Sequence, residues 1–200
     1  VGNFVGKEAL AAVGGTTGTL INLLVGFFVG LTSGATVIIS QLFGAQQYRE
    51  VSEAVHTAMA LSIAGSILLT VGGILVAPAA LRAMGTPEDI MEYSTAYIRI
   101  YFGGTLFSLV YNMGASILRA VGDSKRPLYF LMASCGVNIV LDLVFVVWFK
   151  MEVVGVAIAT VLSQVFSAVL VVVTLMRTTL PYHMDLRKIR FHMAMLKKII

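Results

Sequence analysis

The chain has 200 residues, of which 58% are hydrophobic and only 12% are charged, with a formal net charge of +4. An average soluble domain has roughly 25% charged residues, so this composition excludes a disordered segment, a soluble globular enzyme and a disulfide scaffold. The single cysteine, Cys135, cannot form an internal disulfide or a cysteine-based metal site. We therefore expect a protein that is solvated by lipid.

Long uncharged stretches divide the chain into about five expected membrane-spanning helices, because a helix needs about 20 mostly apolar residues to cross the bilayer core. Turn signals such as Gly85-Thr86-Pro87 and the polar stretch Gly122–Pro127 separate them. In lipid, helices satisfy backbone hydrogen bonds within each segment, and these runs lack the alternation of barrel strands. The expected fold is an all-α polytopic bundle over residues 1–180, with spans at 15–42, 54–80, 94–118, 128–149 and 153–176.

The end of the chain, residues 181–200, differs from the spans. Its apolar residues recur at helical steps of three and four, and its basic residues lie largely off this stripe, which consists of Leu186, Ile189, Met193, Leu196 and Ile200. This pattern predicts a basic amphipathic linker helix on the cytoplasmic face of the membrane. The beginning of a soluble domain is the alternative.

Basic residues are unevenly divided between the two sides that the five spans define. Ten lie in the loops after the first and third spans and in the region after the fifth, and four lie on the other side. The positive-inside rule therefore predicts that the end of the chain is cytoplasmic. The chain begins at Val1 without a basic leader region and ends in Lys-Lys-Ile-Ile, so we expect no signal peptide and a fragment of a longer protein.

Small residues follow one face of the first span at every fourth position. They are Gly14, Gly18, Gly26, Gly30 and Gly34, with Asn22 in the same register. Such a face predicts close helix packing, because backbone approach supplies attraction in lipid. The fifth span has a weaker version at Gly155, Ala159, Ser163 and Ser167.

A carboxylate, Asp142, interrupts the fourth span. Placing it at membrane depth costs about 2.5–3.5 kcal/mol even on a permissive scale, so a partner is expected. Asn138 lies one turn earlier on the same face, and Thr160 and Gln164 share a face of the fifth span. If these spans pack as a hairpin, the four side chains share one polar pocket. Hard oxygen ligands suit Na⁺ and a desolvated carboxylate suits proton uptake; the alternative is a structural hydrogen bond that fixes helix register.

Other polar residues carry weaker signals. Asn22 and Asn112 lie within spans, where they line a cavity together with Gln164 or hydrogen-bond between helices. No histidines have metal-ligand spacing, and the sequence has no nucleophile elbow or phosphate-binding loop. We therefore expect neither an enzyme nor an ATPase, and no metal site beyond possible Na⁺ at Asp142.

At several places the chain resembles the bacterial type of MATE (multidrug and toxic compound extrusion) transporter. The residues that carry the resemblance are Gly6–Gly14, Gly34–Ala45, Ile117–Pro127 and Asn138–Asp142. The resemblance implies that the five spans are helices two to six of a twelve-helix protein. They would form most of its N-terminal lobe, with the C-terminal lobe missing and the amphipathic helix leading toward it.

The resemblance also implies a function. Family members exchange H⁺ or Na⁺ for small organic, often cationic, compounds across the bacterial cytoplasmic membrane, with no cofactor and no nucleic-acid partner. In part of the family a cation site uses an Asp on helix one, an Asn and an Asp on helix five and a Thr on helix six. Asn138, Asp142 and Thr160 match the last three, whereas the helix-one Asp would lie upstream of Val1.

Two other classes remain open. A lipid-linked glycan flippase has related architecture and would need a cationic cavity for a pyrophosphate headgroup, whereas the clearest intramembrane charge here is the acidic Asp142. A non-transporting scaffold or an intramembrane enzyme is the other alternative. Asp142 argues against the scaffold, and the missing nucleophile and base argue against the enzyme.

Overall fold

A computed structural model describes residues 16–199 as a bundle of long helices, without strands in that range. Five long helices come in chain order and short helical segments accompany them. The elements are α2 (Thr16–Gly44), α3 (Tyr48–Ala83), α4 (Glu88–Ala120), α5 (Lys125–Leu143), a π-helical turn η1 (Val144–Trp148), α6 (Glu152–Arg177), a 3₁₀ turn η2 (Leu186–Lys188) and α7 (Met193–Ile199).

The all-α membrane fold expected from the sequence is confirmed. Residues 48–83, 125–148 and 153–177 are each long and apolar enough to cross a membrane, by length and composition. The other two long helices, α2 with 29 residues and α4 with 33, exceed the length that a crossing requires. Large apolar side chains also face outward, including Leu68 and Leu75 on α3, each 73% exposed. An apolar outer surface of this kind suits lipid rather than water.

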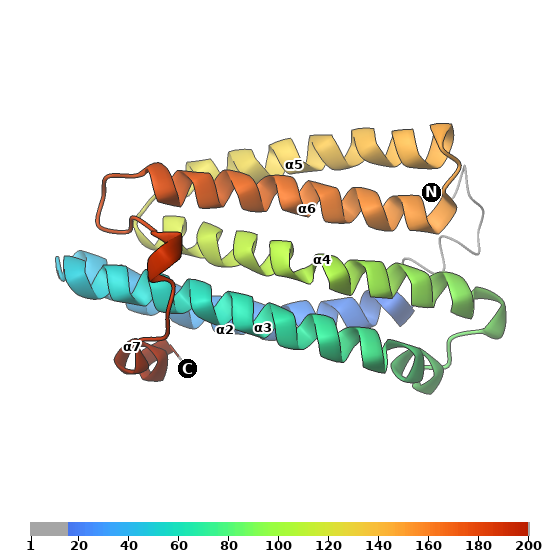
Figure 1. Ribbon diagram of the computed structural model, residues 1–200, viewed down its shortest axis with the longest axis horizontal. Coiled ribbons are helices and arrows are strands. Elements are labelled where there is room, and N and C mark those ends of the chain that lie inside the picture. Colours follow the sequence, from blue (N-terminus) through green and yellow to red (C-terminus); the bar gives the residue numbers. More distant parts are fainter. Residues whose placement is uncertain (1–15, 200) are drawn as a thin grey trace.

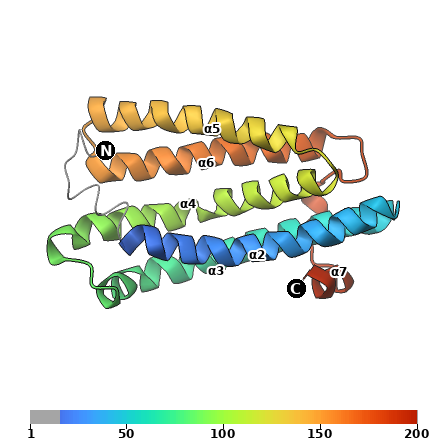
Figure 2. The same ribbon diagram turned by 180° about the vertical axis from the view of Figure 1, so that it is seen from behind.

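The helices are arranged around α4, with α5 and α6 on one side and α2 and α3 on the other (Figures 1 and 2). Short connections make successive helices antiparallel. Gly85 and Gly122 take positive φ values of 73° and 90° just after α3 and α4, where glycine ends a helix without strain. As expected, the loops at 45–47 and 121–124 and the chain after α6 share one end of the bundle, and the loops at 84–87 and 149–151 share the other (Figure 1).

Glycines of several helices allow close packing in this fold, and two of them lie on α4. A Cβ atom at Gly104 would lie 2.5 Å from Val161 Cγ2, and one at Gly114 would lie 2.8 Å from Val171 Cγ2, so α4 and α6 approach closely. On the expected close-packing face of the first span, a Cβ atom at Gly34 would lie 2.5 Å from the Ile199 carbonyl oxygen, whereas Gly26 and Gly30 have nothing within 4 Å among the described residues. The cause is that α2 packs through another face, which includes the buried Ala35, Ile39 and Leu42. Gly14 lies outside the described residues.

The weaker small-residue pattern predicted for the fifth span does lie at helix contacts of α6. Ala159, Ser163 and Ser167 are buried in α6. A Cβ atom at Gly155 would lie 3.0 Å from Phe145 Cβ in the π-helical turn η1. Small side chains therefore let α6 lie against its neighbours at close range.

The single amphipathic helix expected over residues 181–200 is not what the structure forms. Residues 186–188 form a 3₁₀ turn, and helix resumes only at Met193. Leu186 and Met193 of the expected apolar stripe are 51% and 68% exposed, whereas Tyr182, Met184 and Met195 outside it are buried.

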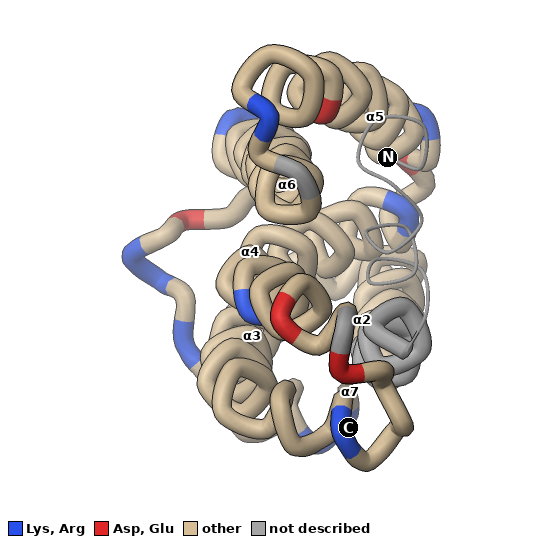
Figure 3. Tube along the Cα trace, turned by 90° about the vertical axis from the view of Figure 1, so that its right-hand side faces the viewer, with Lys and Arg blue, Asp and Glu red and all other residues tan. Residues whose placement is uncertain are grey.

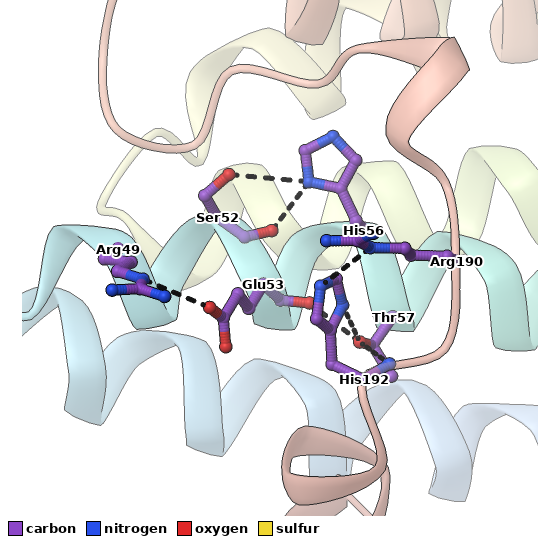
Figure 4. Close-up of polar contacts among 7 residues, drawn as sticks. All are labelled: Arg49, Ser52, Glu53, His56, Thr57, Arg190 and His192. Atoms are coloured by element: carbon purple, nitrogen blue, oxygen red, sulfur yellow. Dashed lines mark hydrogen bonds and ion pairs between the residues drawn. The ribbon is translucent and has the colours of Figure 1, made fainter.

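The reason for this difference is that side chains of α3 bind the backbone of this region, which we call the tail (residues 178–199). His56 Nδ1 lies 2.7 Å from the Ser52 carbonyl oxygen and donates to it, so Nε2 accepts a hydrogen bond from the Asp185 backbone N–H at 3.1 Å. Thr57 Oγ1 accepts from the His192 backbone N–H at 3.1 Å (Figure 4). These bonds and the buried Met184 hold the tail against α3, so that it does not form one continuous helix.

Candidate functional site

A polar cavity of about 350 Å³ lies between α4, α5 and α6. Hydroxyl and amide side chains dominate its lining, and none of the lining residues carries a formal charge. They are Ser108, Tyr111 and Asn112 from α4, Leu131, Ser134, Cys135 and Asn138 from α5, and Thr160, Ser163, Gln164 and Ser167 from α6.

The structure brings together four of the residues that the sequence singled out. Asn112, Asn138, Thr160 and Gln164 all line this cavity. Asn138 on α5 lies near Thr160 and Gln164 on α6 because the two helices form a hairpin through the three-residue loop at 149–151. A buried hydrogen bond from Ser134 Oγ to the Ser163 carbonyl oxygen, 2.6 Å long, joins the two helices beside the cavity. The roles of the four residues remain predictions.

Asp142 lies one helical turn beyond Asn138 on α5 and is not among the lining residues of the cavity. Its position continues the spacing of Leu131, Cys135 and Asn138, so it follows the same face of the helix. The Asp142 side chain is half-buried. Of the four residues expected to share a pocket, Asn138, Thr160 and Gln164 line this cavity. The Asp142 carboxylate lies one helical turn beyond it.

Three polar atoms near this site are buried without a hydrogen-bond partner among the described residues. They are Asp142 Oδ1, Asn138 Nδ2 and Gln164 Oε1. Leaving a buried polar group unpaired costs about 1–3 kcal/mol, so each such group calls for an explanation, and a bound ion, water or ligand is one. Their concentration on facing helices marks this region as a candidate binding site.

Neighbouring polar groups are used within their own helices. Thr160 Oγ1 donates to the Val156 carbonyl oxygen at 2.9 Å, and Asn112 Nδ2 donates to the Ser108 carbonyl oxygen at 2.8 Å. These bonds use the Thr160 hydroxyl hydrogen and one of the two Asn112 amide hydrogens, so both side-chain oxygens keep acceptor capacity toward the cavity. Oxygen acceptors of this kind suit a hard cation or a hydrogen-bond donor on a substrate.

Sequence reasoning missed several features of the site. Ser108 and Tyr111 share the cavity with Asn112, and their spacing of three and four residues on α4 could have revealed this polar face. Regular α-helix also ends at Leu143, immediately after Asp142, and continues as the π-helical turn η1. Turns of this kind occur frequently at functional sites, and no signal in the sequence predicts this one. The Asn22 side chain lies outside the described residues.

Comparisons with known proteins agree with this description. The MatE family model matches residues 1–144. The chain is 32% identical over 204 residues to the probable multidrug resistance protein YoeA of Bacillus subtilis, covering 100% of this chain and 44% of that protein. The chain thus spans less than half the length of this relative.

Solved transporter structures have the same fold. A MATE protein in its bent conformation matches 99% of this chain and 45% of its own length, with a TM-score of 0.92 and 27% identity. A transporter of the MOP superfamily from Pyrococcus furiosus, described as having a binding pocket of reverse polarity that suggests a different function, matches 99% of this chain and 44% of its own, with a TM-score of 0.89 and 28% identity.

Proposed function

Because the chain belongs to the MatE family of membrane transport proteins, we propose that it supplies one half of an exporter that exchanges H⁺ or Na⁺ for small organic, often cationic, compounds. The observation that carries this proposal is the polar cavity between α4, α5 and α6 with unpaired polar atoms of Asn138 and Gln164 buried beside it. Alternating access requires a second half that moves against this one, so the proposal concerns the full-length protein.

In this proposal, Asp142, Asn138 and Thr160 form the cation-coupling site. The carboxylate binds either a proton or Na⁺, and the two neighbouring residues supply a neutral amide and a hydroxyl. Asp142 Oδ1 supports this role because it is buried and has no hydrogen-bond partner among the described residues. An unpaired carboxylate at membrane depth raises the free energy of the protein, and a bound cation would offset that cost. The π-helical turn that follows Asp142 gives this part of α5 a backbone that differs from a regular helix.

Asn112 and Gln164 belong to the substrate pathway in the same proposal, with Asn22 as a further contributor. A cavity of about 350 Å³ lies at the lower end of the range for small-molecule sites. Its uncharged hydroxyl and amide lining suits organic cations better than a pyrophosphate headgroup, because the lining contains no cationic side chain. This observation favours an exporter over a lipid-linked glycan flippase.

The proposed activity can be tested with the full-length protein in proteoliposomes. We expect transport of a fluorescent organic cation when a pH gradient or a Na⁺ gradient is imposed, and none when both ions are balanced across the membrane. Proteoliposomes without protein provide the baseline. Transport that requires ATP, or that proceeds equally without either ion gradient, would contradict cation exchange.

We further propose that the protein lies in the bacterial cytoplasmic membrane with the Lys125 end of the bundle in the cytoplasm. In a Cys135→Ala background, Lys125→Cys should resist a membrane-impermeant thiol reagent added to intact cells. Lys150→Cys, at the opposite end of the bundle and also exposed, should be labelled readily. Labelling of Lys125→Cys with protection of Lys150→Cys would reverse the orientation.

A further inference from the structure

An apolar groove of about 330 Å³ lies on the face of the bundle where the tail crosses α3 and α4 (Figure 1). Its lining comes from α3, α4, α6 and the tail, and every lining residue is apolar. It is separate from the polar cavity, because α4 directs Leu106 and Val110 to the groove and Ser108 and Asn112 to the cavity. The two sites occupy opposite faces of the central helix.

The groove begins where the charged part of α3 ends. Acidic and basic residues occupy the first turns of α3 up to Glu53, and none follows before Arg82. The tail is bound to α3 at His56 and Thr57, immediately after this boundary, and Met59 and Ile63 then line the groove. From this order we expect the tail to lie at the depth of the lipid headgroups and the groove at the depth of the acyl chains.

Side chains of the tail divide between the groove and its outer surface. Leu186 and Ile189 line the groove, whereas Arg187, Lys188 and Arg190 are exposed. Figure 3 marks lysines and arginines in blue along the tail, which crosses outside the bundle from α6 toward α3. The segment therefore presents apolar side chains and cations next to one another.

One carboxylate, Asp185, lies beside these cations. The Asp185 carboxylate contacts Lys188 Nζ at 3.7 Å and accepts a hydrogen bond from the Arg187 backbone N–H at 3.0 Å. That backbone hydrogen bond holds the pKa of Asp185 below its usual value, so the carboxylate stays ionised at neutral pH and loses its charge only in stronger acid. Arg190 Nε donates to His192 Nε2 at 3.2 Å, which leaves the terminal nitrogens of its guanidinium for another acceptor. After Asp185 is matched with Lys188, the two arginines remain as surplus positive charge.

We propose that the groove and the tail together bind one anionic phospholipid, with an acyl chain in the groove and the phosphate at Arg187 and Arg190. The groove supplies apolar contact, and the arginines supply charge at headgroup depth, where basic residues attract anionic lipid. This site lies apart from the polar cavity and does not depend on the transported compound or the coupling ion.

Native mass spectrometry of the full-length protein in detergent tests this proposal, with phosphatidylglycerol and phosphatidylcholine of identical chains added separately. We expect the wild type to retain phosphatidylglycerol in preference to phosphatidylcholine. An Arg187→Gln/Arg190→Gln variant should lose about fivefold in phosphatidylglycerol affinity for each arginine removed. The control is Lys125→Gln/Arg126→Gln, which removes two exposed cations of α5 at the same end of the bundle that do not line the groove, and it should keep the preference.

The groove is tested by Val169→Trp, which introduces a large ring at an exposed position of its lining and should reduce phosphatidylglycerol retention. Val140→Trp makes the same change at an exposed position of α5 outside the groove and should not. Equal retention of the two lipids, or an unchanged preference after loss of Arg187 and Arg190, would overturn the proposal. Unchanged retention in Val169→Trp would also overturn it, as would full displacement by inorganic phosphate, which would indicate a simple anion site.

Discussion

Replacing Asp142 with Asn should lower ion-gradient-driven export in proteoliposomes by about tenfold or more, because coupling between sites in proteins typically amounts to about 5–150-fold. The substitution keeps the shape of the side chain and removes the charge that we propose binds the cation. The variant should fold and insert normally, since a buried unpaired carboxylate atom is replaced by a neutral group. Thr160→Val should have a smaller effect, because it removes one oxygen ligand and no charge.

The matched control for this experiment is Asp123→Asn, which makes the same chemical change in the loop before α5. Asp123 Oδ2 lies 3.3 Å from Arg126 Nε in a surface ion pair, and such pairs contribute little to stability. The control should transport at nearly the wild-type rate. If Asp142→Asn instead exports at the wild-type rate with unchanged ion dependence, Asp142 serves only to hydrogen-bond within the bundle and the coupling site lies elsewhere.

Replacing Gly104 with Ala should destabilise the protein by about 1–3 kcal/mol, the usual cost of adding a methyl group to a filled core. The new Cβ atom would lie 2.5 Å from Val161 Cγ2 and 3.0 Å from Val161 Cγ1. Valine is β-branched and has one strongly preferred rotamer in a helix, so α4 and α6 must separate to relieve the contact. Thermal unfolding of the purified full-length protein in detergent should show a lower midpoint.

The neighbouring glycine provides the control. Gly103 is exposed and has nothing within 4 Å of a built Cβ atom, so Gly103→Ala should unfold at the same temperature or slightly higher. Adding Val161→Ala to Gly104→Ala should recover part of the loss, because it removes the two methyl groups in conflict. Equal midpoints for the two glycine variants would mean that the α4–α6 contact yields without cost and does not limit stability.

The spans could be predicted from the sequence because their cause is local. A run of apolar residues between charges is sufficient to specify a helix in lipid, and the expected span at 153–176 lies within α6 at Glu152–Arg177. The pairing of Asn138 with Thr160 and Gln164 was predictable for a related reason. A loop of three residues leaves α5 and α6 no alternative to lying side by side, so positions on facing sides of a short hairpin must meet.

Features that depend on distant partners could not be predicted in this way. The tail has an apolar helical period, but its backbone is held by His56 and Thr57, more than 120 residues earlier in the chain. The spacing of apolar residues reports only on contacts within one segment. In the tail, hydrogen bonds to α3 prevent the helix that this spacing predicts. The glycine face of α2 is only partly packed for the same reason, because Gly34 meets the backbone of Ile199 whereas Gly26 and Gly30 have no helix opposite them among the described residues.

The brevity of the loops has a consequence for how the protein enters the membrane during synthesis. Between α2 and α6 the connections are only three or four residues long, at 45–47, 84–87, 121–124 and 149–151. No folded domain lies between these helices. When a hairpin of two helices inserts, only a few turn residues and the charges at the helix ends have to cross the bilayer. For loops this short, the distribution of lysine and arginine decides orientation. We therefore expect positions such as Arg49, Lys125 and Arg126 to act as insertion signals before the protein has folded.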